Sequence, residues 1–264
     1  MARAYCLCTP FLFACAATAQ AADNRVSLTT ERADYSNDFG KRRIITAEST
    51  TDTGSTAFTV TVSHGKRTFE EESFSAVRVS GTVFHDWSDR LYTRTSFGLS
   101  SDKPVFATRE LSNDVNFKLL PNTVVTVGAK HARYHDNRDA ISWSAGGSWY
   151  FAGGLVSYRY SSFDVDKLGK SHGHLATVRL KDGKGRGSTQ LWLGKGTSLH
   201  EQELLLEGRR GTYRSVVLQR VQPAKGPVSF TASLGRTWFD TAVTEYRGTT
   251  ASVGLSYTGL KLFN

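Results

Sequence analysis

The sequence predicts an all-β protein that crosses a membrane as an up-and-down antiparallel β-barrel of about 14 strands, or about 12 if two weak segments merge. Three observations lead to this prediction. Apolar and polar residues alternate along one segment after another, and helical periodicity is almost absent. Short and long polar connectors follow each other in turn. Aromatic residues gather near the ends of segments, where tilted strands would leave the membrane.

The first 21 residues have the features of a cleaved secretory signal peptide, which leaves residues 22–264 as a single barrel domain. An apolar run over residues 5–17 ends in the small-x-small pattern Ala-Gln-Ala. This run is shorter than the roughly 20 residues that a membrane-spanning helix needs. All three cysteines lie in this leader, and a lipoprotein modified at Cys15 is the weaker alternative. The mature chain would therefore contain no cysteine.

The alternating segments are long enough for tilted membrane strands, which need about 9–11 residues. Strands of a secreted β-sandwich, the alternative all-β architecture, are usually nearer five or six residues. In the segment 141–151, apolar residues such as Ile141, Trp143 and Trp149 would face lipid, and the serines between them would face the lumen. The segments are about ten to thirteen residues long, and the clearest alternation within them covers 58–63, 77–83, 91–99, 115–119, 125–130, 141–151, 176–180, 213–221, 228–239 and 246–257.

The connectors between these segments predict which end of the barrel is which. In an outer-membrane barrel, short turns face the periplasm and longer loops face the exterior. Short connectors lie near residues 52–54, 87–89, 121–122, 152–154 and 182–185, and longer polar ones near 37–40, 65–72, 101–107, 135–139 and 164–171. Counting residues 199–210 as a strand would make fifteen, an odd number that bacterial barrels seldom have. As an external loop or strand extension, that segment leaves fourteen strands.

Tryptophan and tyrosine favour the membrane interface, because each joins an apolar ring to a polar tip. The aromatic residues near segment ends are therefore expected to form interfacial girdles. They are Trp87, Trp149, Tyr150, Tyr158, Tyr160, Trp238, Tyr246 and Tyr257.

Basic residues fall on the polar face of the predicted strands, which would line the lumen. By alternation this face carries Arg78, Arg94, Lys118, Lys130, Arg159 and Arg179, together with Tyr92. Few carboxylates can be assigned to the same face, and Glu48 and Glu207 have an uncertain register. Two interpretations remain open: a net basic lumen that favours anions, and a plugged lumen held by internal ion pairs. The formal net charge of +9 is spread over many strands, so nucleic-acid binding is not expected.

Two histidine-containing clusters are the candidates for chemistry. A lipid-modifying hydrolase would need a serine beside a histidine, and histidines two apart on a strand can share a metal. The clusters are Ser171, His172 and His174, and His131, His135, Asp136 and Asp139. No third metal ligand is evident in the first cluster, and loops carry such residues routinely. We therefore expect solvated loop histidines, with no metal, no cofactor and no enzymatic activity.

The stretch ERADYSNDFGKRR after the leader, the Gly/Ser/Tyr-rich hairpins and the ending EYRGTTASVGLSY resemble the YaiO family of outer-membrane β-barrels over residues 23–258. The resemblance implies an outer-membrane barrel similar to the pore domains of exopolysaccharide exporters. One departure concerns the end of the chain, where such barrels usually finish on an aromatic residue that the assembly machinery reads. Here Tyr257 is followed by TGLKLFN, and Phe263 is penultimate.

The sequence thus predicts a passive pore in the outer membrane of a Gram-negative bacterium, for saccharides or other anionic solutes and linked to exopolysaccharide. A closed scaffold of an envelope polysaccharide system and a lipid-modifying hydrolase are the alternatives. The expected partners are the outer-membrane bilayer, the barrel assembly machinery and saccharides.

Overall fold

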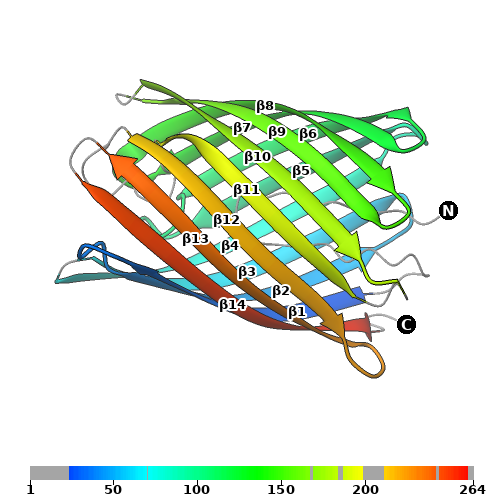
Figure 1. Cartoon of the computed structure of the whole chain (residues 1–264), viewed down its shortest axis with the longest axis horizontal. Helices are drawn as coiled ribbons and strands as arrows, with labels where there is room; N and C mark the ends of the chain where they lie inside the picture. Colours follow the sequence, from blue (N-terminus) through cyan, green and yellow to red (C-terminus); the bar gives the residue numbers. More distant parts are fainter. Residues whose placement is uncertain are drawn as a thin grey trace.

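The computed structural model describes residues 24–69, 71–166, 169–183, 187–198, 211–241 and 244–260 (Figure 1). The expected leader, residues 1–21, lies outside the described residues, as do Glu207 and the whole of segment 199–210. Among the described residues, no helix is long and apolar enough to cross a membrane.

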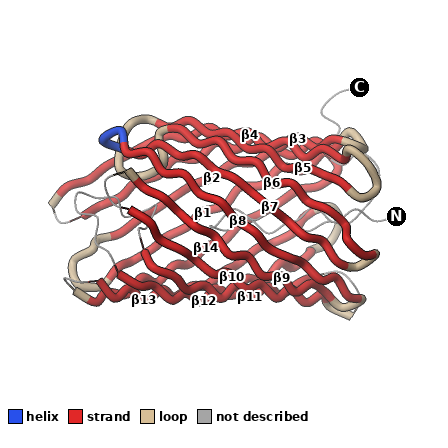
Figure 2. Tube along the Cα trace, turned by 90° about the horizontal axis from the view of Figure 1, so that it is seen from above, coloured by secondary structure: helices blue, strands red, loops and turns tan. Residues whose placement is uncertain are grey.

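The described chain forms one closed antiparallel barrel of 14 strands, which confirms the predicted fold class and the higher of the two strand numbers (Figures 1 and 2). Each strand pairs with its neighbours in sequence, and β1 pairs with β14 to close the ring. The strands are β1 (Asn24–Tyr35), β2 (Lys41–Asp52), β3 (Thr56–Phe69), β4 (Glu72–Asp86), β5 (Leu91–Ser100), β6 (Arg109–Leu120), β7 (Thr123–Tyr134), β8 (Arg138–Phe151), β9 (Gly154–Val165), β10 (Gly169–Lys181), β11 (Ser188–Ser198), β12 (Gly211–Pro223), β13 (Val228–Thr241) and β14 (Glu245–Leu260). One short 3-10 helix, η1 (His135–Asn137), joins β7 to β8.

The alternation in the sequence becomes an inner and an outer face of the sheet. On β8, Trp143 is 66% exposed on the outer face, whereas its neighbour Ser142 is 9% exposed on the inner face. The outer face carries an apolar belt that runs around the barrel, with Leu28, Val60, Phe97, Leu193 and Val253 among its exposed members. A closed ladder pairs the backbone amides of every strand, so the sheet leaves no free edge in lipid.

The two ends of the barrel differ in their connections. The end with the first residue of β1 and the last of β14, which we call the terminal end, has short turns such as that between β8 and β9. At the opposite end, which we call the loop end, several expected long loops are shorter than predicted. Residues 65–69 extend β3, β4 starts at Glu72, and β10 starts at Gly169. These strand extensions contain polar residues on both faces, so the alternation that marks a strand inside lipid is lost there.

Residues 101–108 form a long described loop at the loop end, and this loop folds inward. Val105 is 8% exposed and Ala107 is 6% exposed. A Cβ atom on the lumen-facing Gly65 of β3 would lie 2.6 Å from both Val105 and Phe106. Ala107 also belongs to a buried apolar cluster with Ala132, Tyr134, Ala140 and Val165. The loop therefore narrows the loop end of the lumen from within.

Candidate functional site: the polar lumen

The structure places the basic residues chosen by alternation on the inner face of the barrel. Arg78 lies on β4, Arg94 and Tyr92 on β5, Lys118 on β6, Lys130 on β7, Arg159 on β9 and Arg179 on β10. Arg94 and Arg179 are 7% and 6% exposed, because the side chains of neighbouring strands cover them inside the barrel. These cations come from strands that lie next to one another in the closed sheet, apart from β8 between β7 and β9. The middle of β8 places Ser142, Ser144, Gly146 and Ser148 on this face, with Arg138 and Tyr150 towards its two ends.

Carboxylates that the sequence analysis missed lie among these cations. Two of them, Glu110 and Asp114, project from β6 into the lumen. Glu110 Oε2 lies 3.2 Å from Arg78 Nη2 and 3.4 Å from Lys130 Nζ. Each β6 carboxylate thus contacts cations on both sides of its strand. A second group of pairs lies on β1 and β2, where Arg42 binds Glu31 at 2.8 Å and Arg25 binds Glu48 at 3.4 Å.

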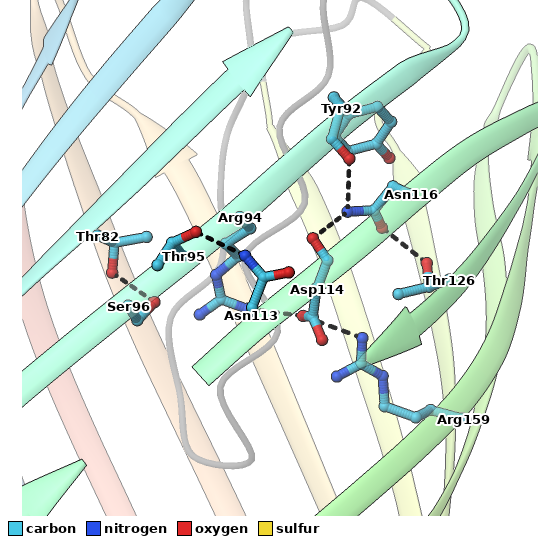
Figure 3. A network of polar contacts seen from close by, with 10 residues as sticks. All are labelled: Thr82, Tyr92, Arg94, Thr95, Ser96, Asn113, Asp114, Asn116, Thr126 and Arg159. Carbon is cyan, nitrogen blue, oxygen red and sulfur yellow. Dashed lines mark hydrogen bonds and ion pairs between the residues drawn. The ribbon is translucent and has the colours of Figure 1, made fainter. Parts of the chain in front are cut away.

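Asp114 is the centre of the best-connected part of the lumen (Figure 3). Its Oδ2 atom lies 3.1 Å from Arg159 Nη2 and 3.7 Å from Arg94 Nη1. One carboxylate therefore joins guanidinium groups from β5 and β9. Next to it, Asn116 accepts a 2.7 Å hydrogen bond from the Thr126 hydroxyl. The shared carboxylate holds both arginines against the wall of the barrel.

Glycines on the intervening strands allow these ion pairs to form. The Asp114–Arg159 pair crosses β7 and β8, where the residues facing the lumen are Gly128 and Gly146. A Cβ atom on Gly128 would overlap the Asp114 carboxylate, and one on Gly146 would lie 2.5 Å from the backbone of β9. Arg78 crosses β5 in the same way over Gly98, where a Cβ would lie 2.9 Å from its Nη2 atom. Side chains at these glycines would separate the charges.

A solvent-accessible cavity lies beside this network in the lumen. Its lining includes Arg94 and Arg159, and also the aromatic residues Phe84, Tyr92 and Tyr150. Charged groups and aromatic rings thus meet in one water-accessible space. A site of this composition can attract a polar solute electrostatically and can stack a flat apolar face of that solute against a ring.

Lumen-facing cations outnumber lumen-facing carboxylates in the described strands, so the ion pairs leave a surplus of positive charge. With the first and last residue of each strand left out, the lumen-facing cations are Arg25, Arg42, Arg67, Arg78, Arg94, Lys118, Lys130, Arg159 and Arg179, and the carboxylates are Glu31, Glu48, Glu110 and Asp114. Arg67, only 2% exposed, lies over the Tyr35 ring at 5.6 Å from its centroid. Both features foreseen as alternatives, the basic surplus and the internal ion pairs, are present in the same lumen.

Most of the expected interfacial aromatic residues project outward. The six that do so, each between 40% and 64% exposed on the outer face or at its edge, are Trp87, Trp149, Tyr158, Tyr160, Trp238 and Tyr257. Two differ from the expectation. Tyr150 lies on the inner register of β8 and lines the cavity. Tyr246 is 3% exposed inside the loop end. The proximity of both residues to strand ends suggested an interface position, but their register turns them inward.

Tyr246 belongs to an aromatic stack at the loop end of the lumen. Its ring stacks on Phe39 at 3.9 Å and on Phe239 at 4.4 Å between centroids. Phe39 in turn meets the edge of Phe69 at 6.0 Å. This stack and the inward loop 101–108 narrow the same end of the barrel.

The structure separates the members of the first histidine cluster and pairs members of the second with other side chains, and the Asp136 side chain lies outside what the structure describes. Ser171 faces the lumen, whereas His172 and His174 face outward from β10, so the serine and the histidines lie on opposite sides of the sheet. His174 Nδ1 lies 2.6 Å from the Tyr158 hydroxyl. In the other cluster, Asp139 pairs with His131 and Arg133, and His135 pairs with Asp102. The described residues contain no group of three or more side chains arranged to hold a metal ion.

Solved outer-membrane channels resemble the chain in fold. The channel described as the CymD monoaromatic hydrocarbon channel aligns with a TM-score of 0.64 at 8% identity, covering 91% of this chain and 89% of that one. The Pseudomonas putida toluene transporter TodX aligns with a TM-score of 0.58 at 8% identity, covering 91% and 90%. Acinetobacter baumannii Omp33 aligns at 0.51 and 13% identity, covering 90% and 99%. At these identities the likeness concerns the fold alone.

The sequence itself gives the more specific relationship. The family model described as the YaiO membrane beta barrel domain matches residues 23–203, which is more than half of the chain. This stretch runs from β1 to beyond β11 and so includes the charged lumen network of β4 to β9. The chain belongs to the YaiO family of membrane β-barrels.

Proposed function

We propose that this barrel is a passive outer-membrane pore for small polar solutes, with anionic saccharides as the preferred class. The observation that carries the proposal is the lumen, in which a cation surplus and aromatic rings surround the Arg94–Asp114–Arg159 cluster. In this proposal the terminal end faces the periplasm and the loop end faces the exterior. The barrel has no catalytic step.

Selection would come from electrostatics and stacking. Cations that line a narrow lumen raise the local concentration of anions and lower that of small cations. Tyr92 and Tyr150 offer ring faces to the apolar side of a sugar. Because Asp114 fixes both arginines, the positive groups keep their places in the wall and do not move with the solute.

The setting of this function is the outer membrane of a Gram-negative bacterium. The partners we propose are the bilayer, the machinery that inserts barrels, and the saccharide itself. A link to exopolysaccharide traffic is the finer form of the proposal. Glycosyltransferase genes beside the gene for this chain would support it.

Removing the negative charge or the positive charges of the Arg94–Asp114–Arg159 cluster, in separate variants, tests the pore directly. Refolded protein is placed in a planar lipid bilayer, and the reversal potential is measured under a salt gradient. We expect discrete current steps with anion preference in the native protein. Asp114→Asn should strengthen that preference because it removes a negative charge, and Arg94→Gln with Arg159→Gln should weaken or invert it because they remove two positive charges.

Lys225→Gln in an exposed turn at the terminal end is the control for loss of a charge outside the lumen. Each variant is first checked for the heat-modifiable gel band of a folded barrel. Equal reversal potentials in the Asp114 and arginine variants would contradict the proposed pore.

A closed scaffold is the second candidate, and the aromatic stack of Phe39, Tyr246 and Phe239 at the loop end favours it. This candidate predicts no current from protein that is fully folded by the gel criterion. The same recording therefore separates the two functions.

A further inference from the structure

A row of cations and aromatic residues crosses the outer face of β10 to β14. In the register of the sheet, His174 lies opposite Lys195, Lys195 opposite Arg214, Arg214 opposite Trp238, and Trp238 opposite Arg247. We call these five residues the outer basic row. Lys195, Arg214, Trp238 and Arg247 are exposed, and His174 is half-buried.

The positive charges in this row lie close enough to repel one another, and none of its lysine and arginine side chains forms an ion pair within the described part of the chain. Side chains directly opposite on neighbouring strands have Cβ atoms about 4.5–5.5 Å apart, and like charges at that distance destabilise the pairing. Lys195 and Arg214 are such a pair. Neither of them, nor the Arg247 side chain, forms an ion pair with any other described residue. Arg236, on the same outer face, donates a hydrogen bond to Thr249 and brings a further positive charge close to Trp238.

The position of the row along the strands indicates its surroundings. On β10, β11 and β12, the next outward-facing residue towards the terminal end is apolar. These residues are Ala176, Leu193 and Val216. Leu193 is 47% exposed, as expected for a side chain in contact with lipid tails. On the other side of the row, Asp240 and Glu245 lie nearer the loop end. On β10 to β12 the row thus lies at the loop-end border of the apolar belt, where hydrocarbon gives way to headgroups.

A similar arrangement occurs on β1 to β3. Arg43 lies opposite Arg32 on one side and opposite Lys66 on the other, all on the outer face near the loop end. Arg32 is partly compensated there by Asp34 at 2.7 Å. Cations at the border of the apolar belt are therefore a repeated feature of the loop end, and the outer basic row is the example without a carboxylate partner among the described residues.

We propose that the outer basic row binds the phosphate groups of a phosphorylated glycolipid in the outer leaflet of the membrane. A guanidinium group donates two parallel hydrogen bonds to a phosphate, and a lysine ammonium adds a compact positive charge. An anion placed between Lys195 and Arg214 removes their mutual repulsion. Trp238 lies between Arg214 and Arg247, and its ring can rest at the level of the headgroups. The acyl chains of the same lipid would cover Leu193 and Val216.

Binding of lipid A to the detergent-refolded full chain tests this proposal. The probes are bisphosphorylated lipid A and its dephosphorylated form in the same micelles, with inorganic phosphate as competitor. We expect the native protein to retain the phosphorylated lipid and to release most of the dephosphorylated one. The triple variant Lys195→Gln, Arg214→Gln, Arg247→Gln should bind the phosphorylated lipid roughly 100-fold more weakly, since each cation near an anionic lipid surface contributes about 1 kcal/mol.

A matched control removes three positive charges from connecting segments, with Arg90→Gln, Lys103→Gln and Lys225→Gln, and should bind like the native protein. The exchange Lys195→Arg with Arg214→Lys keeps both charges and should also retain binding. If the triple variant fails to give a folded band, Arg214→Gln alone takes its place.

Two results would contradict binding of a membrane lipid: equal retention of the two lipids by the native protein, or release of the phosphorylated lipid by inorganic phosphate at millimolar concentration. Unchanged binding in the folded variant would overturn assignment to this row.

Discussion

At the scale of single residues, the lumen depends on small residues as much as on charged ones. Asp114 reaches Arg159 across β7 and β8, where a Cβ atom on Gly128 would overlap the Asp114 carboxylate and one on Gly146 would press on the backbone of β9. Both cations joined by Asp114 would keep their charge if the carboxylate were lost, because arginine does not deprotonate in proteins. The glycines therefore determine which charges meet, although they have no charge themselves.

The substitution Gly128→Ala tests this role. The new Cβ atom would overlap the Asp114 carboxylate and approach the Ser144 hydroxyl at 2.8 Å, so the ion pair must shift. We expect a loss of about 1–3 kcal/mol in the free energy of unfolding, the usual cost of overpacking. The measurement is the urea midpoint of refolded protein. Gly147→Ala on the outer face of β8 is the control, because its Cβ would meet only one atom, at 3.7 Å. An equal change in both variants would show that the ion pair tolerates a side chain at position 128.

Part of this residue-level arrangement could be predicted from the sequence. Alternation alone placed Arg78, Arg94 and Arg159 on the polar face, because a charge on the lipid side is costly. It missed Glu110 and Asp114, since the stretch RELSND resembles a polar loop and the predicted segment began only at residue 115. In the structure β6 begins at Arg109. Two of the ion pairs, Arg78–Glu110 and Arg159–Asp114, join strands that are not sequence neighbours, and a sequence without the barrel geometry does not give those distances.

At the scale of elements, the loop end differs from the prediction more than the terminal end does. Strands here continue past the apolar belt, where both faces meet water and the period of two no longer separates apolar from polar residues. The sequence therefore indicated loops over 65–72 and 164–171, where the structure has the ends of β3 and β9 and the beginnings of β4 and β10. Loop 101–108 was expected in the right place, but its inward course depends on Gly65 of β3, which is far away in sequence.

The inward loop gives a prediction for permeation. Val105→Ser with Phe106→Ser removes the apolar side chains that lie against Gly65, so the loop should leave the lumen and single-channel conductance should rise. Burial of each apolar side chain contributes about 1.5–3 kcal/mol, which is enough to hold a loop of this size in place. The control Lys103→Ser changes an exposed residue of the same loop. A conductance that stays at the native value in the double variant would mean that the narrowest point lies elsewhere, for example at the Asp114 cluster.

At the scale of the whole molecule, the pairing of β1 with β14 closes the sheet into a ring and leaves no strand with an unpaired edge. Parity of the strand number and the alternation of connectors were enough to predict an antiparallel ring. Strand parity and connector length are regularities of bacterial outer-membrane barrels, and closure itself follows from the rule that every backbone amide in lipid needs a partner within the protein. The register of β1 against β14 could not be predicted, because these strands have no turn between them to set it. In the structure Ser27 lies opposite Ser256.

Cysteine pairs test the closure in membranes. The substitutions Ser27→Cys and Ser256→Cys place two thiols at opposite positions on the lumen side, within the Cα separation of about 4.4–6.8 Å that a disulfide requires. Oxidation should produce a cross-linked species whose mobility on a denaturing gel changes on reduction. The pair Ser27→Cys and Ser229→Cys is the control, because β14 separates these residues. Cross-linking of both pairs to the same extent would contradict the register of the closing strands.

The pairing of β1 with β14 also has a consequence for the order of events in the cell. The ribosome completes β1 first and β14 last, and at about 5–20 residues per second this takes on the order of ten seconds or more. During that time, and throughout export, β1 has no partner on one of its edges. An unpaired edge with residues such as Leu28 and Val26 can join the strands of other chains. The yield of closed barrels should therefore depend on how long newly made chains are kept apart, in addition to the stability of the finished ring.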